Sequence, residues 1–142
     1  MTALIHQEYP IAAEDYTRAG EASADIKRRL KQLGVSSMVL RRVAVASYEV
    51  ELNLVIHSLG GTIDFSVDED GVTLLIRDRG PGIPDLDLAM REGWSTAPES
   101  VRNMGFGAGM GLPNMKRNAD EFDIQSTVGV GTQILMKFHL KK

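Results

Sequence analysis

The sequence of 142 residues contains no cysteine, only five prolines and few aromatic residues. Without cysteine the chain can form neither a disulfide framework nor a thiolate metal site, and a reducing compartment is the natural location. No apolar run approaches the roughly 18 residues of a membrane-spanning helix, and no N-terminal stretch has the pattern of a signal peptide. We therefore expect a cytoplasmic protein that does not associate with a membrane.

An excess of positive charge is also missing. Sixteen basic and nineteen acidic residues are interspersed along the chain, and the formal net charge is −3. Such a balance provides no broad basic face for a phosphodiester backbone, so nucleic acid is not an expected partner. His6, His57 and His139 lie far apart in the sequence and form no pair with the spacing of zinc ligands, which makes a structural zinc site improbable.

The length and the pattern predict a single domain over residues 1–142, with no internal repeat, low-complexity tract or linker. Residues 3–9 are predicted to form a short strand, whose pairing Pro10 ends because it has no N–H group. Apolar residues at three- and four-residue spacing predict a helix over about 13–33, although Gly20 weakens this prediction. A second helix follows to about His57, with one of two preceding serines as its cap.

The second half of the chain alternates between strands, helices and loops. We expect a hairpin of strands 62–67 and 72–77, a short helix over about 84–91, a lid over about 92–108, a helix over about 112–121 and a final hairpin over 122–127 and 132–140. This order favours an α+β fold. The expected architecture is a two-layer sandwich with the helices on one face of a mixed, largely antiparallel sheet.

The second helix carries two polar residues at the edge of its apolar stripe. At about 100° per residue, Asn53 lies about 40° from Glu49, whereas Glu51 is nearly opposite Glu49 and is expected to be solvated. A carboxylate beside an amide oxygen can activate a hydroxyl group or water and help to hold Mg²⁺. Alone, the pair also fits an ordinary polar border of a helix. His57 falls on the apolar stripe near the helix end, which favours a packed or capping residue over a catalytic one.

Nine of the fourteen glycines lie between Gly80 and Gly131, and eight of these nine form three clusters. The first cluster follows a strand that ends at Asp78, whose carboxylate could accept a hydrogen bond from the exocyclic amine of adenine. Gly80 and Gly82 would leave room for the base, as in purine sites with few polar groups in an apolar pocket. A tight turn between strand and helix is the alternative interpretation of this motif.

The second cluster, residues 105–111, alternates glycine with other residues and leads into a helix. Backbone amides and the positive end of the helix dipole could converge there on phosphate groups, although a flexible hinge has the same pattern. Two registers are possible, and we prefer the one that ends at Gly111 because it directly precedes the helix. The candidate phosphate contacts are Gly107, Gly109, Gly111 and Leu112, with Arg102 and Lys116 as weaker candidates.

The third cluster places Gly131 and Thr132 at the start of the last strand. The Thr132 hydroxyl would lie near Asp78 if their two strands are neighbours; alone, the pair indicates only a hairpin. Two other phosphate motifs are excluded, because the chain has no P-loop signature and its glycine run does not follow an N-terminal strand in a βαβ unit.

Taken together and in this order, four motifs resemble the Bergerat ATP-binding fold of the GHKL superfamily: Glu49-x-x-x-Asn53, Asp78-x-Gly80-x-Gly82, Gly109-x-Gly111-Leu112 and Gly131-Thr132. Within that superfamily, the compact size and the runs over 78–85, 93–96 and 111–122 resemble the serine/threonine switch kinases and anti-sigma kinases of bacterial partner-switching systems. The likeness is greatest to the RsbT-type stressosome kinases.

This resemblance implies an ATP- and Mg²⁺-dependent kinase that phosphorylates a serine or threonine of a STAS-domain antagonist protein, with a PP2C-type phosphatase or a sigma factor as possible further partners. By motif position it assigns Glu49 as catalytic base, Asn53 as magnesium ligand, Asp78 as the adenine-binding carboxylate with Gly82 beneath the ring, Gly109 and Gly111 as phosphate-loop amides, and Thr132 as a second contact near the adenine. Residues 97–106 form a longer segment than in the relatives it resembles.

Three other functions are alternatives to this one. An anti-sigma factor that sequesters a sigma factor, with or without kinase activity, shares the same motifs. The ATPase half of a histidine kinase would need a dimerising hairpin with a phosphoacceptor histidine, for which the one helix before Ser36 leaves no room. A degenerate domain that has lost ATP is disfavoured because every expected polar group is present.

Overall fold

Within the described part of the chain, five strands form one sheet in which each neighbouring pair is antiparallel; their order across the sheet is β1 (Ile5–Ile11), β2 (Gly61–Val67), β3 (Gly71–Asp78), β5 (Gly131–His139) and β4 (Glu121–Thr127). The computed structural model describes residues 5–57, 60–80, 90 and 111–140. In chain order the elements are β1 (Ile5–Ile11), η1 (Tyr16–Arg18), α1 (Glu21–Gln32), α2 (Ser37–His57), β2 (Gly61–Val67), β3 (Gly71–Asp78), α5 (Gly111–Asn118), β4 (Glu121–Thr127) and β5 (Gly131–His139).

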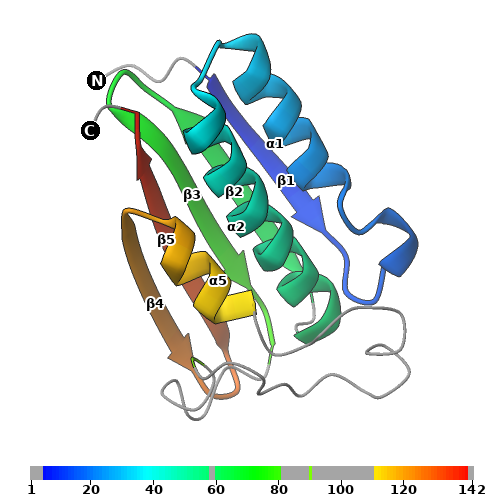
Figure 1. The fold of residues 1–142 in the computed structure, drawn as a ribbon. Helices are drawn as coiled ribbons and strands as arrows, with labels where there is room; N and C mark the ends of the chain where they lie inside the picture. The colour runs from blue at the N-terminus through cyan, green and yellow to red at the C-terminus, as the bar shows by residue number, and fades with distance from the viewer. Residues whose placement is uncertain (1–4, 58–59, 81–89, 91–110, 141–142) are drawn as a thin grey trace.

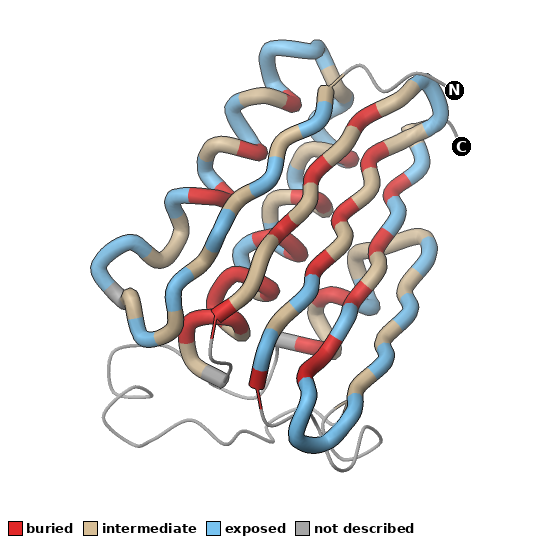
Figure 2. Tube along the Cα trace, turned by 180° about the vertical axis from the view of Figure 1, so that it is seen from behind, coloured by how far each residue is buried: buried red, intermediate tan, exposed pale blue. Residues whose placement is uncertain are grey.

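The helices α1, α2 and α5 lie side by side over one face of this sheet, with α2 in the middle (Figure 1). Alternate strand residues point into the layer between sheet and helices, as the period of a strand requires. Phe65, Leu74, Met136 and Phe138 are fully buried there. Seen from behind in Figure 2, the described strands present their other face without a covering helix. The predicted α+β two-layer sandwich is therefore confirmed.

The strand at the N-terminus differs from its prediction. β1 continues through Pro10 to Ile11, and Pro10 is paired with Thr62 of β2. Within the described sheet β1 is an edge strand, so it bonds to a neighbour on one side only. Proline is tolerated in an edge strand where its missing N–H would face away from the neighbouring strand. The prediction that Pro10 ends the pairing was therefore wrong.

The first helix is shorter than predicted. α1 begins at Glu21, not near residue 13, because Gly20 has φ 102° and lies in the left-handed region. Glycine adopts that conformation without steric cost, and the helix cannot extend back through it. The short turn η1 precedes it.

The second helix, both hairpins and the helix after the glycine run lie close to the predicted positions. The Ser36 hydroxyl oxygen accepts a hydrogen bond from the Val39 amide at 3.3 Å and caps α2 as expected. Asp68 accepts hydrogen bonds from the amides of Asp70 and Gly71 at 2.8 and 3.0 Å, which closes the β2–β3 turn. The predicted short helix at 84–91, apart from residue 90, and the lid at 92–108 lie outside the described residues.

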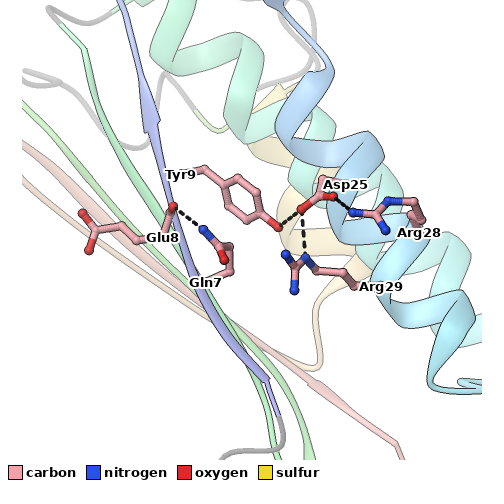
Figure 3. Close-up of polar contacts among 6 residues, drawn as sticks. All are labelled: Gln7, Glu8, Tyr9, Asp25, Arg28 and Arg29. Atoms are coloured by element: carbon pink, nitrogen blue, oxygen red, sulfur yellow. Dashed lines mark hydrogen bonds and ion pairs between the residues drawn. The ribbon is translucent and has the colours of Figure 1, made fainter.

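A polar cluster joins β1 to α1 (Figure 3). The Tyr9 hydroxyl donates a hydrogen bond to Asp25 at 2.6 Å, and Arg29 donates to the same carboxylate oxygen at 2.9 Å. Arg28 is bonded to the other oxygen of Asp25. The Tyr9 bond and then the two arginines lower the pKa of Asp25 to about 2, against the effect of desolvation. Burial and the Asp25 contact raise the pKa of Tyr9.

The variant Tyr9→Phe is expected to lower the free energy of unfolding at pH 7 by about 1 kcal/mol, because it removes one hydrogen bond whose acceptor, Asp25, is partly exposed to solvent. A carboxyl group with a depressed pKa in the folded state contributes stability above its unfolded pKa of about 3.9 and loses it as the pH falls through the folded value. The difference between wild type and variant should therefore shrink between about pH 4 and pH 2. Urea unfolding at pH 7 and pH 2 measures it. An equal difference at both values would contradict the assignment to Asp25.

No helix in the part of the chain that the structure describes has both the length and the hydropathy needed to cross a membrane.

Candidate functional site

Glu49 and Asn53 lie one turn apart on α2, and both are half-buried. The Glu49 side chain lies on the flank of α2 next to α5, where its Oε1 accepts a hydrogen bond from Nδ2 of Asn114 at 3.5 Å. Burial raises the pKa of the Glu49 carboxyl group, and the Asn114 hydrogen bond opposes this rise. A carboxylate with a raised pKa is a stronger base, which suits it to accept a proton.

The prediction that Glu51 is solvated is wrong. The residue is almost completely buried, with 1% of its surface exposed. Its two carboxylate oxygens accept hydrogen bonds from the backbone amides of Ala22 and Ser23 at 3.1 and 2.9 Å. These are among the first amides of α1, which have no partner within their own helix. The residue before α1, Gly20, provides no side-chain cap. Glu51 therefore caps α1 from the neighbouring helix.

The prediction for Glu51 was wrong because it did not include the position of α1. On α2, Glu51 points about 200° away from Glu49, which is the side against which α1 packs. The helical wheel gives the orientation of a residue relative to the core but not the position of a neighbouring helix. The available signal was the first turn of α1 itself, which begins after a glycine and lacks a local capping side chain.

Asp78 is the last residue of β3 and is half-buried. It follows the alternation of Leu74 and Ile76, so its side chain lies on the face of the sheet that the helices cover. Burial raises the pKa of Asp78, and a hydrogen bond from the Thr132 amide opposes this rise. That bond joins the Thr132 nitrogen to Asp78 Oδ1 at 2.6 Å.

Two glycines bring the neighbouring strands unusually close to Asp78. A Cβ atom at Gly61 of β2 would overlap the carbonyl oxygen of Arg77, and one at Gly131 of β5 would overlap the carbonyl oxygen of Asp78 itself. Gly131 also has φ 153°, within the range that favours glycine. The end of β3 thus lies in close contact with the glycine backbone of β2 on one side and of β5 on the other, which fixes the position of the Asp78 carboxylate.

The predicted neighbourhood of Asp78 and Thr132 is confirmed, because β3 and β5 are paired. The contact differs in its atoms. Thr132 reaches Asp78 through its backbone amide, while its hydroxyl oxygen lies 2.8 Å from the hydroxyl oxygen of Ser126 on β4. The hydroxyl therefore links β5 to β4.

A cavity of about 910 Å³ opens at the end of the sheet where β3 finishes. It is lined by Asp78 and Arg79, by Glu51 and Val55 of α2, and by residues from β1, β2 and the start of α1. Glu49 and Asn53 are not among the described residues that line it. Glu49 lies on the other flank of α2, next to α5. The C-terminal ends of α2 and β3 and the N-terminal end of α5 lie at the same end of the molecule (Figure 1). A single pocket shared by Glu49 and Asp78 stays a prediction.

The glycine motifs are described only in part. Gly80 is buried, and its amide donates to the carbonyl oxygen of Val130 at 3.3 Å. Gly111 is the first residue of α5, and Leu112 is buried in the core beneath it. Lys116 is exposed on α5. The other predicted contacts, namely Gly82, Arg102, Gly107 and Gly109, lie outside the described residues, as does the side chain of His57.

Two polar groups beside the site were not identified from the sequence. One is Asn114 in the first turn of α5, for which the only signal was its position directly after the glycine run. The other is the half-buried pair of Arg42 and Asp120, whose side chains lie 3.1 Å apart. Arg42 also donates to the carbonyl oxygen of Asn118 at 2.7 Å, and Asp120 accepts from the His139 amide at 2.7 Å. This pair ties α2 to the end of α5 and to β5.

Comparison with known proteins identifies the family. The model of the histidine kinase-, DNA gyrase B-, and HSP90-like ATPases matches residues 39–142, which is more than half of the chain. The chain belongs to this ATPase family. It is 34% identical over 108 residues to the serine/threonine-protein kinase RsbT of Bacillus subtilis, an alignment that covers 73% of this chain and 75% of the relative.

Anti-sigma F factors are similar to the same extent. The factor of Geobacillus kaustophilus is 34% identical over 117 residues, covering 78% of this chain and 77% of the relative. That of Priestia megaterium is 32% identical over 118 residues, with coverages of 78% and 77%. These comparisons confirm the predicted GHKL family and the predicted class of enzyme, an ATP-dependent protein serine/threonine kinase.

Proposed function

We propose that this protein is a cytoplasmic, ATP- and Mg²⁺-dependent kinase that phosphorylates a serine or threonine of a STAS-domain antagonist in a partner-switching stress-response pathway. The observation that carries the proposal is the half-buried carboxylate of Glu49, which has a raised pKa and lies one turn before Asn53 in a chain of this ATPase family. The kinase RsbT among its relatives supports transfer to a protein hydroxyl group.

Glu49 is the proposed catalytic base. It would accept the proton of the acceptor hydroxyl group as that oxygen attacks the γ-phosphorus of ATP, with ADP as the leaving group. The raised pKa increases the basicity of this carboxylate. The protein's remaining task in such a reaction is to position the reactants and to stabilise charge.

Asn53 is the proposed magnesium ligand through its amide oxygen. Among the described residues there is no group of three or more acidic or histidine side chains that could hold a metal ion. A single amide oxygen beside a carboxylate fits Mg²⁺ nevertheless, because this ion keeps several waters and takes other ligands from substrate phosphates. Bound magnesium would neutralise charge on the phosphate groups during transfer.

Asp78 is the proposed adenine-binding carboxylate. Its Oδ1 accepts the Thr132 amide, and we assign Oδ2 to the exocyclic amine of the base. The close approach of Gly61 and Gly131 supports a fixed position for this group, as a specific purine contact requires. We assign the phosphate contacts to the amides of Gly109 and Gly111, ahead of α5.

The similarity to anti-sigma F factors favours a second candidate function. In that case the protein would bind and sequester a sigma factor and phosphorylate an anti-anti-sigma factor, and a PP2C-type phosphatase could reverse the modification. The nucleotide site would be the same in both cases. The two functions differ in the surface that binds a partner.

Incubation of the purified protein with ATP labelled in the γ-phosphate, Mg²⁺ and STAS-domain proteins of the same organism tests the proposal. We expect label on one serine or threonine of one of these proteins, identified by mass spectrometry, and no transfer when EDTA removes the magnesium. A parallel pull-down with purified sigma factors separates the two candidates. The proposal is wrong if ATP binds but no STAS-domain protein gains label.

A further inference from the structure

Three polar groups form a chain from the surface of α5 to Glu49. Nη1 of Arg117 donates to Oδ1 of Asn114 at 3.0 Å, and Nδ2 of Asn114 donates to Oε1 of Glu49 at 3.5 Å. We propose that Asn114 is a positioning residue, itself oriented by Arg117, that fixes the direction in which the Glu49 carboxylate faces. This inference rests on the proposed function of Glu49 as the base.

The chemistry of the three groups determines the order of the chain. A guanidinium group only donates hydrogen bonds and does not lose its charge in proteins. It must therefore face the carbonyl end of the Asn114 amide, which leaves the NH₂ end directed at Glu49. Arg117 lies three residues after Asn114, so the two side chains are neighbours on one face of α5. The Glu49 carboxylate receives a donor from a fixed direction.

The distance of 3.5 Å is long for a hydrogen bond. Hydrogen bonds of catalytic groups are often long without substrate and shorten when the reactive complex forms. A contact of this length contributes little to folding, so its loss should lower stability only slightly. Alanine is also a better helix former than asparagine, which makes Asn114→Ala a variant that should fold.

Charged groups elsewhere on α2 and on the elements packed around it are held by partners of their own. On α2, Arg42 is paired with Asp120, and Glu51 is bonded to the first amides of α1. On α1, Asp25 is held by Tyr9 and two arginines, and at the end of β3 Asp78 is held by the Thr132 amide. Lys116 and Arg117 are the cations of α5. The causes of the pKa shift of Glu49 are burial and then the Asn114 hydrogen bond.

The direct test is a titration of the Glu49 side chain by ¹³C NMR of its carboxyl group, in the protein without nucleotide. With the Asn114 donor removed, burial acts unopposed, so Asn114→Ala should raise the midpoint by roughly half a pH unit. Arg117→Ala should raise it by a smaller amount, because the amide is then free to turn. Lys27→Ala removes an exposed cation of α1 and should leave the midpoint unchanged.

The second readout is the pH profile of phosphoryl transfer. The base must be ionised, so the acid limb of kcat/KM, which reports the protein without nucleotide, should move upward in Asn114→Ala as the NMR midpoint does, while the KM for ATP stays constant. Asn114→Gln keeps an amide group, so the midpoint of this variant should lie between those of the wild type and Asn114→Ala. The inference is overturned if the Glu49 midpoint does not move in Asn114→Ala, or if Lys27→Ala moves it as far as Arg117→Ala does. Because the titration needs no transfer, it gives this answer even if the proposed kinase function fails.

Discussion

Replacement of Glu49 by glutamine should reduce phosphoryl transfer by about 10²–10⁴-fold, the usual contribution of a general base. Glutamine has nearly the same shape but cannot accept the proton of the acceptor hydroxyl group. Binding of ATP should be unchanged, since the residues proposed to contact the adenine ring and the phosphate groups lie elsewhere. Among the variants that concern the chemistry, this one should have the largest effect.

Single-turnover transfer from labelled ATP, with enzyme in excess over ATP, measures this effect without interference from product release. Glu8→Gln provides the matched control, because Glu8 is exposed on β1 and the same change of chemical group is made there. Transfer by Glu49→Gln at the wild-type rate would show that another group acts as the base. A loss of both transfer and ATP binding would instead assign Glu49 to nucleotide binding.

Replacement of Glu51 by alanine should lower the free energy of unfolding by about 3 kcal/mol. The change leaves two buried amides of α1 without partners, and each bond to a charged acceptor is worth about 1.5–3 kcal/mol. It also removes a cap, which alone is worth about 1 kcal/mol. Such a loss is large against a total stability of about 5–15 kcal/mol. The side chain is 1% exposed, so water cannot readily replace it.

Urea unfolding followed by circular dichroism measures this loss. Glu51→Gln should cost less than Glu51→Ala, because one of its two terminal atoms still accepts a hydrogen bond while the other becomes a donor facing an amide. Glu69→Ala, an exposed acidic residue in the β2–β3 turn, should change stability by less than about 0.5 kcal/mol. If Glu51→Ala is as stable as Glu69→Ala, the capping role is wrong.

The elements that the sequence predicted correctly are those with local signals. The apolar stripe of α2 and the hydroxyl cap at Ser36 mark that helix, and the Asp68 turn marks the hairpin between β2 and β3. Both signals arise from residues within a few positions of one another, so the pattern alone suffices. The sequence placed Asp78 close to Thr132 only if their two strands are neighbours. The structure shows that β3 and β5 are paired.

The errors have a common cause in contacts between distant segments. Pro10 is tolerated because β1 lies at an edge of the described sheet, and a sequence does not state which strand is an edge. Glu51 is buried because α1 packs against that side of α2, 28 and 29 residues away in the chain. The donor to Glu49 comes from Asn114, 65 residues later. Local periodicity carries no information about such contacts.

For the candidate site too, the sequence indicated the residues but not their surroundings. Glu49, Asn53 and Asp78 could be selected because their spacing and the glycines around them form a recognisable set. The surroundings of these residues could not be predicted. Burial raises the pKa values of Glu49 and Asp78, and the local sequence pattern does not show which helices and strands bury them. Physical roles for these residues therefore need measurements of binding and of transfer.

The central claim is that the chain binds Mg·ATP with Asp78 recognising the adenine, and isothermal titration calorimetry of the wild type and Asp78→Asn tests it most directly. We expect one nucleotide per chain for the wild type and an affinity at least about tenfold lower for Asp78→Asn, because its amide cannot serve as a charged acceptor for both the Thr132 amide and the adenine amine. The account is contradicted if the wild type takes up no adenine nucleotide, or if Asp78→Asn binds it as tightly as the wild type.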